Sequence, residues 1–211
     1  MLDLIQKGGP LMWVIVVCSI TALAAFFERL VYLHKASIPT SDLLRGLSNL
    51  LRKENYAEAI QECAGTAGPV ARVAHAVILR HDAPRAELRD IAQEAGQLEV
   101  PKLERNLPLL ATIAYTAPLL GLLGTLLGLL EAFQQIIAER GYATPIDIAG
   151  GVYESLLTAA ASLAVAIPAF IAYSYLSSRV NRLIHDMERV GIEVLVILDD
   201  VRRGAQPPSA T

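Results

Sequence analysis

The 211-residue sequence has few charged residues, only two cysteines and no surplus of basic side chains. Charged residues make up 18% and hydrophobic residues 54%, and the mean hydropathy of +0.43 is that of a membrane protein rather than a soluble globular chain. The 18 Lys and Arg against 21 Asp and Glu give a net charge of -3, so no basic surface for nucleic acid is expected. Cys18 and Cys63 stand at no metal-ligand spacing, so neither a disulfide framework nor a zinc site is predicted.

Motifs for catalysis and cofactor binding are also missing from the sequence. It has no phosphate-binding glycine loop followed by Lys, no HExxH pair and no nucleophile with a base in reach. The four histidines lie at unrelated spacings outside the apolar runs and are expected to face solvent. We therefore expect neither an enzyme nor a bound cofactor or metal.

Three long apolar runs dominate the sequence: residues 10–27, 107–130 and 156–176. A helix needs about 20 residues to cross roughly 30 Å of hydrocarbon, and all three runs fall within the usual range around that length. The second and third runs contain no charged side chain, and Trp13 stands where an interfacial aromatic residue is common. The sequence therefore predicts an all-α membrane protein with three transmembrane helices.

The distribution of basic residues predicts the orientation of these helices. Residues 28–106 hold 11 of the 18 Lys and Arg, residues 177–203 hold five, and the connector 131–155 holds only Arg140. Because basic segments stay on the cytoplasmic side, the first two segments are predicted inside, and residues 1–9 and the connector in the periplasm. The first run could instead be a cleaved signal peptide, but export of the segment behind it would reverse this charge pattern.

The predicted cytoplasmic segment contains four amphipathic helices. Capping residues and prolines predict the first three at about residues 40–52, 55–64 and 69–81. Pro84 opens the fourth helix, which is expected to continue into the second span with bends at Pro101 and Pro108.

The third span is expected to continue as one helix from about residue 154 to 203. Apolar residues recur every three or four positions between 180 and 201, and such a stripe must be covered. The cover is either the fourth cytoplasmic helix, in an intramolecular hairpin, or neighbouring subunits, and partial burial against subunits is favoured. Residues 204–211 are expected to form a disordered tail.

Small and hydroxyl-bearing residues recur at helical spacing in the second and third runs. The second run contains Ala117, Gly121, Gly124, Thr125 and Gly128, and the third region contains Ser155, Thr158, Ala159, Ser162 and Ala166. Such faces are typical of close helix packing, and a pore lining is the alternative. No Asp, Glu, Lys, Arg or His lies inside any run, so a proton carrier would have to come from another chain.

Two segments resemble the membrane helices of the ExbB/TolQ/MotA proton-channel family. The run IAYTAPLLGLLGTLLG at 113–128, followed by Phe133, resembles the second helix of that family, and the run from Glu154 through LAVAIP at 163–168 to Tyr173 resembles its third helix. Three spans favour the ExbB/TolQ branch over the four-span MotA branch. The resemblance covers essentially the whole chain.

This resemblance implies a function and a set of partners. It implies a homopentamer in the bacterial inner membrane that surrounds an ExbD- or TolR-like single-span protein carrying a membrane Asp. The assembly would use the transmembrane proton gradient to energise a periplasmic TonB- or TolA-like client. A membrane scaffold that gathers partners and conducts nothing is the alternative.

The resemblance also implies roles for individual residues. Thr125 matches the pore threonine of the second helix, Glu154 matches the glutamate at the outer start of the third, and Pro168 falls among the helix-packing positions. The third-helix threonine of the family is replaced by Ala159, so Thr158 or Ser162 is expected to supply the hydroxyl, unless neither faces the pore. Ser162 itself stands where a small glycine is usual, and Ser174 where an asparagine commonly follows the tyrosine.

Overall fold

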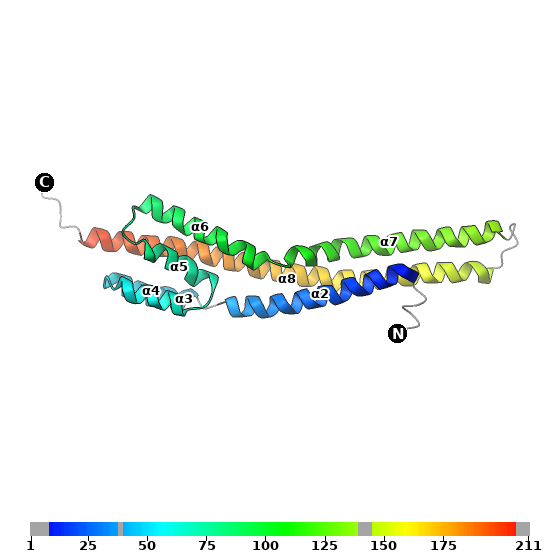
Figure 1. Cartoon of the computed structure of the whole chain (residues 1–211), viewed down its shortest axis with the longest axis horizontal. Coiled ribbons are helices and arrows are strands. Elements are labelled where there is room, and N and C mark those ends of the chain that lie inside the picture. The colour runs from blue at the N-terminus through cyan, green and yellow to red at the C-terminus, as the bar shows by residue number, and fades with distance from the viewer. Residues whose placement is uncertain (1–8, 38–39, 139–144, 206–211) are drawn as a thin grey trace. The chain divides into compact units, whose positions relative to one another are not determined.

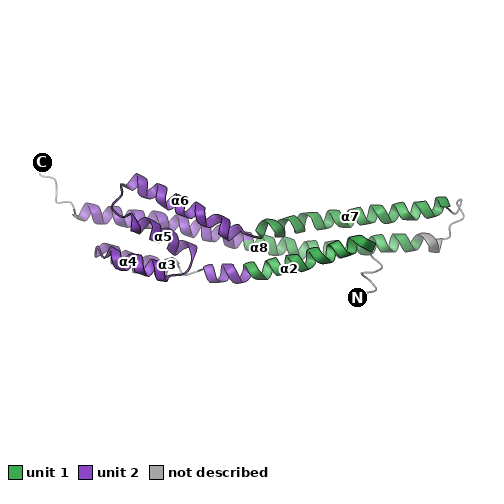
Figure 2. Ribbon diagram, viewed as in Figure 1, with its two compact units in different colours: residues 1–29, 106–176 green, residues 30–105, 177–211 purple. Residues whose placement is uncertain are grey.

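The computed structural model describes residues 9–37, 40–138 and 145–205, and these form helices and short connections without a β-strand (Figure 1). They divide into two compact units (Figure 2). Unit 1 comprises residues up to 29 and residues 106–176, and unit 2 comprises residues 30–105 and those from 177 onward. Two helices, α2 and α8, contribute residues to both units.

Unit 1 is built from the three helices that are long and apolar enough to cross a membrane: α2 (Gly9–Ala36), α7 (Leu107–Ala138) and α8 (Pro145–Ala205). Three candidate spans were predicted, and each of the predicted runs lies within one of these longer helices. Many of their large apolar side chains, such as Ile20 and Leu119, are exposed on the single chain, as lipid-facing residues are.

Both ends of the predicted connector 131–155 are helical. The α7 helix continues to Ala138 and α8 already begins at Pro145, while residues 139–144 lie outside the described part of the chain. No glycine or proline interrupts the sequence between Leu129 and Ala138, so nothing in the local sequence ends the helix there. Likewise α8 continues to Ala205, so residues 204 and 205 of the predicted tail are helical, and residues 206–211 are outside the described range.

Unit 2 packs four short helices with the C-terminal part of α8. They are α3 (Thr40–Arg52), α4 (Tyr56–Gly65), α5 (Pro69–Leu79) and α6 (Arg85–Glu104), close to the predicted ranges. Asn55 occupies the cap position of α4, but its side-chain oxygen accepts no hydrogen bond from the helix backbone, and its side-chain nitrogen donates to Glu58. The core includes fully buried Leu47, Leu51, Val70, Val77 and Ile78.

The apolar stripe of α8 is covered within the chain. Its buried members are Val180, Leu183, Met187, Val190, Val194 and Leu198. Gly191 allows close approach of α6 and α5, because a Cβ atom added there would lie 3.3 Å from Cβ of Ala92 and 3.8 Å from Cγ1 of Val73. The intramolecular alternative therefore accounts for most of the stripe, and the favoured partial burial against other subunits stays a prediction.

The expected continuation of α6 into the second span is also wrong. The α6 helix ends at Glu104, and Asn106 adopts a left-handed conformation with φ of 62° before α7 begins. Pro108 provides the reason, since a proline is accepted in the first turn of a helix but would break the interior of a continuous one. Asn106 tolerates the left-handed backbone and donates a hydrogen bond to Glu28.

A buried carboxylate joins α5 and α6 in unit 2. Glu99 is 5% exposed, and its two oxygens accept hydrogen bonds from Nη2 of Arg72 at 2.5 Å and Nζ of Lys102 at 2.7 Å. Burial alone would raise the pKa of Glu99, but the two cationic hydrogen bonds outweigh it and hold the pKa below its usual value. The ion pairs therefore stabilise the folded form with Glu99 ionised.

Candidate functional site

The small residues of α7 form a seam against α8 in unit 1. Gly121, Gly124 and Gly128 are buried, and Ala117 is 0% exposed on the same helix face. Opposite them on α8 lie Ser155, Thr158 and Ser162, which are 2%, 2% and 1% exposed. The two helices run antiparallel at this seam, so Gly121 faces Ser162, Gly124 faces Thr158 and Gly128 faces Ser155.

The three glycines of α7 are required by how closely the helices approach. A Cβ atom on Gly121 would lie 1.9 Å from Oγ of Ser162, and one on Gly124 would lie 2.8 Å from Cγ2 of Thr158. One on Gly128 would lie 2.6 Å from Cβ of Ser155 and 2.9 Å from the carbonyl oxygen of Gly151. Such close approach is how membrane helices gain van der Waals contact without a hydrophobic driving force.

Gly151 is a seam residue that the sequence reasoning missed. A Cβ atom added to it would lie 3.2 Å from the carbonyl oxygen of Gly128 and 3.7 Å from Cβ of Ala132. Its spacing of four residues before Ser155 places it on the same helix face and could have revealed it. The apolar run that predicts the third span begins only at residue 156, so it does not include Gly151.

All three hydroxyl groups of the seam donate to carbonyl oxygens of their own helix. Ser155 donates to Val152 at 2.8 Å, Thr158 to Glu154 at 3.0 Å and Ser162 to Ala159 at 2.8 Å. These bonds satisfy the polar groups inside an apolar contact, where an unmade hydrogen bond is costly. Ala159 lies half-buried beside the seam, with its Cα 3.2 Å from the position of a Cβ on Gly121.

Thr125 lies at the edge of the seam and not inside it. Its side chain is half-buried, and its hydroxyl donates to the carbonyl oxygen of Gly121 at 3.0 Å. A hydroxyl oxygen that donates one hydrogen bond still has lone pairs with which to accept another. Thr125 and Thr158, which the family resemblance suggested as two parts of one pathway, therefore differ in exposure within the chain.

Glu154 and Pro168 lie on other faces of α8. The carboxylate of Glu154 points at the start of α2, where its Oε1 lies 2.8 Å from the position of a Cβ on Gly9. Pro168 is exposed and lines an apolar hollow of about 530 Å³ between α2 and α8, together with Ala22, Phe26 and Ala169. Pro168 thus stands beside α2, away from the glycine seam.

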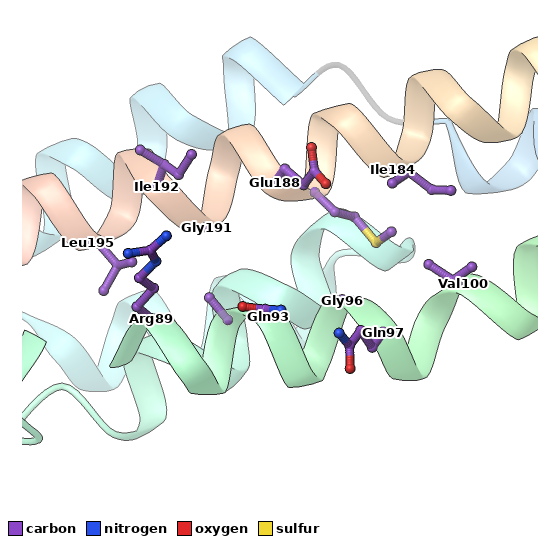
Figure 3. A pocket seen from close by; sticks show the side chains of 12 residues that line it. Arg89, Gln93, Gly96, Gln97, Val100, Ile184, Glu188, Gly191, Ile192 and Leu195 are labelled. Carbon is purple, nitrogen blue, oxygen red and sulfur yellow. The ribbon is translucent and has the colours of Figure 1, made fainter. Parts of the chain in front are cut away.

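A second hollow, of about 360 Å³, lies between α6 and α8 in unit 2 (Figure 3). Arg89, Gln93 and Gln97 come from α6, and Glu188 comes from α8. Apolar residues such as Met187 and Leu195 also line it. Its polar side chains are two amides, the cation of Arg89 and the anion of Glu188. They do not combine a nucleophile with a neighbouring base, as a hydrolytic site would.

Comparison with known proteins identifies the family. Residues 56–189 match the model of the MotA/TolQ/ExbB proton channel family. The chain is 32% identical over 210 residues to an ExbB-like biopolymer transport protein of Synechocystis, covering 95% of this chain and 80% of that protein.

Two further relatives show the same branch. The chain is 28% identical over 190 residues to an ExbB homolog of Methanothermobacter thermautotrophicus, covering 90% of this chain and 67% of the relative. It is 36% identical over 129 residues to the Tol-Pal system protein TolQ of Haemophilus influenzae, covering 60% of this chain and 56% of TolQ. The chain is a multi-pass membrane protein that belongs to the ExbB/TolQ branch of the MotA/TolQ/ExbB proton channel family.

Proposed function

We propose that this chain is the ring-forming subunit of a proton-driven motor in the bacterial inner membrane. Five copies surround the single-span helices of an ExbD- or TolR-like partner, and the assembly performs work on a periplasmic TonB- or TolA-like client. The energy source is the proton gradient, with no bound cofactor. Family membership supports this role, since the relatives carry names of biopolymer transport and Tol-Pal proteins.

The observation that carries the proposal is the lack of ionisable groups in the membrane spans. Residues 107–130 and 156–176 contain no Asp, Glu, Lys, Arg or His, although the family is one of proton channels. A proton pathway needs a group that binds the proton, and such groups are normally found inside the membrane. In the proposed motor a membrane Asp on a partner chain supplies that group. Its hydrogen-bond partner in this chain is Thr125, which is half-buried and whose hydroxyl oxygen can accept a bond besides the one it donates to Gly121.

Purification in mild detergent followed by native mass spectrometry tests the assembly. The expected species contains five copies of this chain together with a single-span protein that has one Asp in its membrane helix. Only monomers or dimers of this chain would contradict the ring. Identification of the other co-purifying chains names the client.

The proposed orientation places residues 40–100 in the cytoplasm and both residues 1–9 and the α7–α8 connection in the periplasm. Single cysteines at Ser48 and Ala143, in a background without Cys18 and Cys63, are expected to label oppositely with an impermeant reagent on intact cells. Equal labelling of the two positions would refute the three-span orientation. Ala143 lies outside the described residues, so this test depends on topology alone.

A non-conducting scaffold is the second candidate, and the third helix favours it. Ala159 has no hydroxyl where the family has threonine, while the Thr158 hydroxyl donates to its own helix and is buried against Gly124. Proton flux into liposomes that contain this chain and its partner separates the two functions. A motor subunit conducts only when the partner is present with its Asp, whereas a scaffold assembles equally well and conducts in neither case.

A further inference from the structure

The hollow between α6 and α8 in unit 2 has an apolar lining and room for another side chain (Figure 3). Met187 and Leu195 line it as buried residues, and Ile192 beside them is 62% exposed. A Cβ atom added to Gly96, which also lines the hollow, would meet nothing within 4 Å. A second chain that covers these apolar groups would remove them from water, and such burial is favourable.

The same hollow carries a cation without a partner in the described part of the chain. The side chain of Arg89 is exposed and makes neither an ion pair nor a hydrogen bond there. Glu188, on the α8 side of the hollow, lies 3.5 Å from Nδ1 of His185 instead. Arg85 and Arg189 in the same unit are paired with carboxylates at 2.9 Å and 2.7 Å. Arg89 is therefore available to a carboxylate of another chain.

An acidic and apolar stripe runs along another side of α6. Four residues at spacings of four, three and four form this α6 stripe: Glu87, Ile91, Glu94 and Leu98. Leu98 is 64% exposed, and within the described ranges neither glutamate side chain has an ion pair or a hydrogen bond. Leu98 is five positions from Gln93 of the hollow, so the two side chains lie about 140° apart around α6. One chain therefore presents the stripe and the hollow on different sides, as a head-to-tail ring requires.

We propose that the α6 stripe of one copy docks in the α6–α8 hollow of the next copy of this chain. The inference rests on the proposed ring and names a surface through which its subunits join. Equivalent residues of a cyclic ring lie at one height along its axis, so with α6 along that axis Leu98 is about 3 Å from the level of Gly96. Glu87 is equally close to the level of Arg89 and pairs with it. Pairing of two stripes with each other is disfavoured, because it would bring their carboxylates together.

Disulfide crosslinking in membranes tests the contact in a background without Cys18 and Cys63. A chain with both Leu98→Cys and Gly96→Cys should form a ladder of oligomers up to the full ring, because each copy offers one thiol to each neighbour. Two cysteines two positions apart on a helix point to different sides and cannot bond to each other within one chain. Each single variant should give no crosslinked dimer. Leu98→Cys with Leu79→Cys, at an exposed residue of α5, is the matched control and should not crosslink.

Charge reversal in the double-cysteine chain tests the ion pair. Glu87→Arg alone would place two cations together, and Arg89→Glu alone two carboxylates, so each should lower the yield of the ladder by about fivefold or more. The two reversals combined restore opposite charges and should bring the yield back to within about twofold. Asp200→Arg, at an exposed residue of α8 outside the stripe and the hollow, is the control and should leave the yield unchanged.

The possible results separate this docking from the ring itself. A ladder that either reversal weakens and both together restore would support the proposal. Pentamers in native mass spectrometry without a ladder, dimers from a single-cysteine chain, or reversals without effect or without recovery would overturn the docking and leave the ring in place. Only monomers or dimers in native mass spectrometry would overturn both.

Discussion

Gly121→Ala is expected to push α7 and α8 apart at the centre of the seam. The new Cβ would lie 1.9 Å from Oγ and 2.7 Å from Cβ of Ser162, and 3.2 Å from Cα of Ala159. Rotation of the hydroxyl relieves only the first of these contacts and breaks its 2.8 Å hydrogen bond to the Ala159 carbonyl. The other two involve atoms fixed to the α8 backbone, so the helices must separate.

The cost follows from these contacts. Overpacking of this kind destabilises by about 1–3 kcal/mol, and a lost hydrogen bond between membrane residues adds about 0.6 kcal/mol. The better helix propensity of alanine returns up to about 1 kcal/mol. We expect a net loss of about 1–2 kcal/mol relative to the wild type, and of about 2–3 kcal/mol relative to Gly150→Ala, a control that gains the same helix propensity and whose new Cβ has no neighbour within 4 Å.

Unfolding of the detergent-solubilised protein, followed by circular dichroism during an SDS titration, measures this difference. The double variant Gly121→Ala with Ser162→Gly removes the two shortest contacts and should recover at least half of the loss. Stability of Gly121→Ala equal to that of Gly150→Ala would refute the seam, and so would a double variant no more stable than Gly121→Ala alone.

Three further outcomes are expected. Thr125→Val keeps the shape of the side chain but removes the hydroxyl, so ring assembly should persist while proton flux falls at least tenfold; full flux would reduce Thr125 to packing. Thr158→Ala should lower stability by about 1 kcal/mol through the lost methyl group and leave flux unchanged, because its side chain is buried against Gly124; a large loss of flux in liposomes would restore a pore-facing role. The pKa of Glu99 is lowered in the folded state, so its ion pairs stabilise the fold above the unfolded pKa of about 4, and this stabilisation is lost as pH falls through the folded pKa. The difference in stability between the wild type and Glu99→Gln, measured by thermal melts, should therefore become smaller below about pH 4. A difference that does not change with pH would contradict the ion-pair assignment.

The spans and the glycine face could be predicted because local physics determines them. Bilayer thickness fixes the length of an apolar run, so three helices were evident without any tertiary information. Small residues spaced by three and four on one helix have little use except close packing, and Gly121, Gly124 and Gly128 all lie in the seam. Apolar residues that recur every three or four positions beyond the third span likewise predict that its helix continues without a break, as α8 does.

The helix ends and the docking of α2 could not be predicted, because they depend on contacts between distant residues. Asn106 interrupts the helix between α6 and α7 with its left-handed backbone, and its side chain donates a hydrogen bond to Glu28, which is 78 positions away in the sequence. The need for glycine at residue 9 arises from a carboxylate on another helix. Neither partner is visible in the local sequence.

The faces of the hydroxyl residues on α8 were uncertain for a geometric reason. Neighbouring helix positions differ by about 100°, so a shift of one residue moves a hydroxyl from one surface to another. The structure places Thr158 and Ser162 on the face that meets α7 of the same chain, and each is bonded to its own backbone.

Because residue 159 is alanine where the family has threonine, a hydroxyl for a proton pathway would have to come from a neighbouring side chain. Thr158, one position earlier, is enclosed between Gly124 and its own helix, and Ser162 is enclosed against Gly121, so neither hydroxyl can reach another chain without opening the seam. Of these three side chains only Thr125 is half-exposed, and it keeps an oxygen able to accept a hydrogen bond. Of these three hydroxyls, Thr125 is therefore the one that another chain can reach without opening the seam.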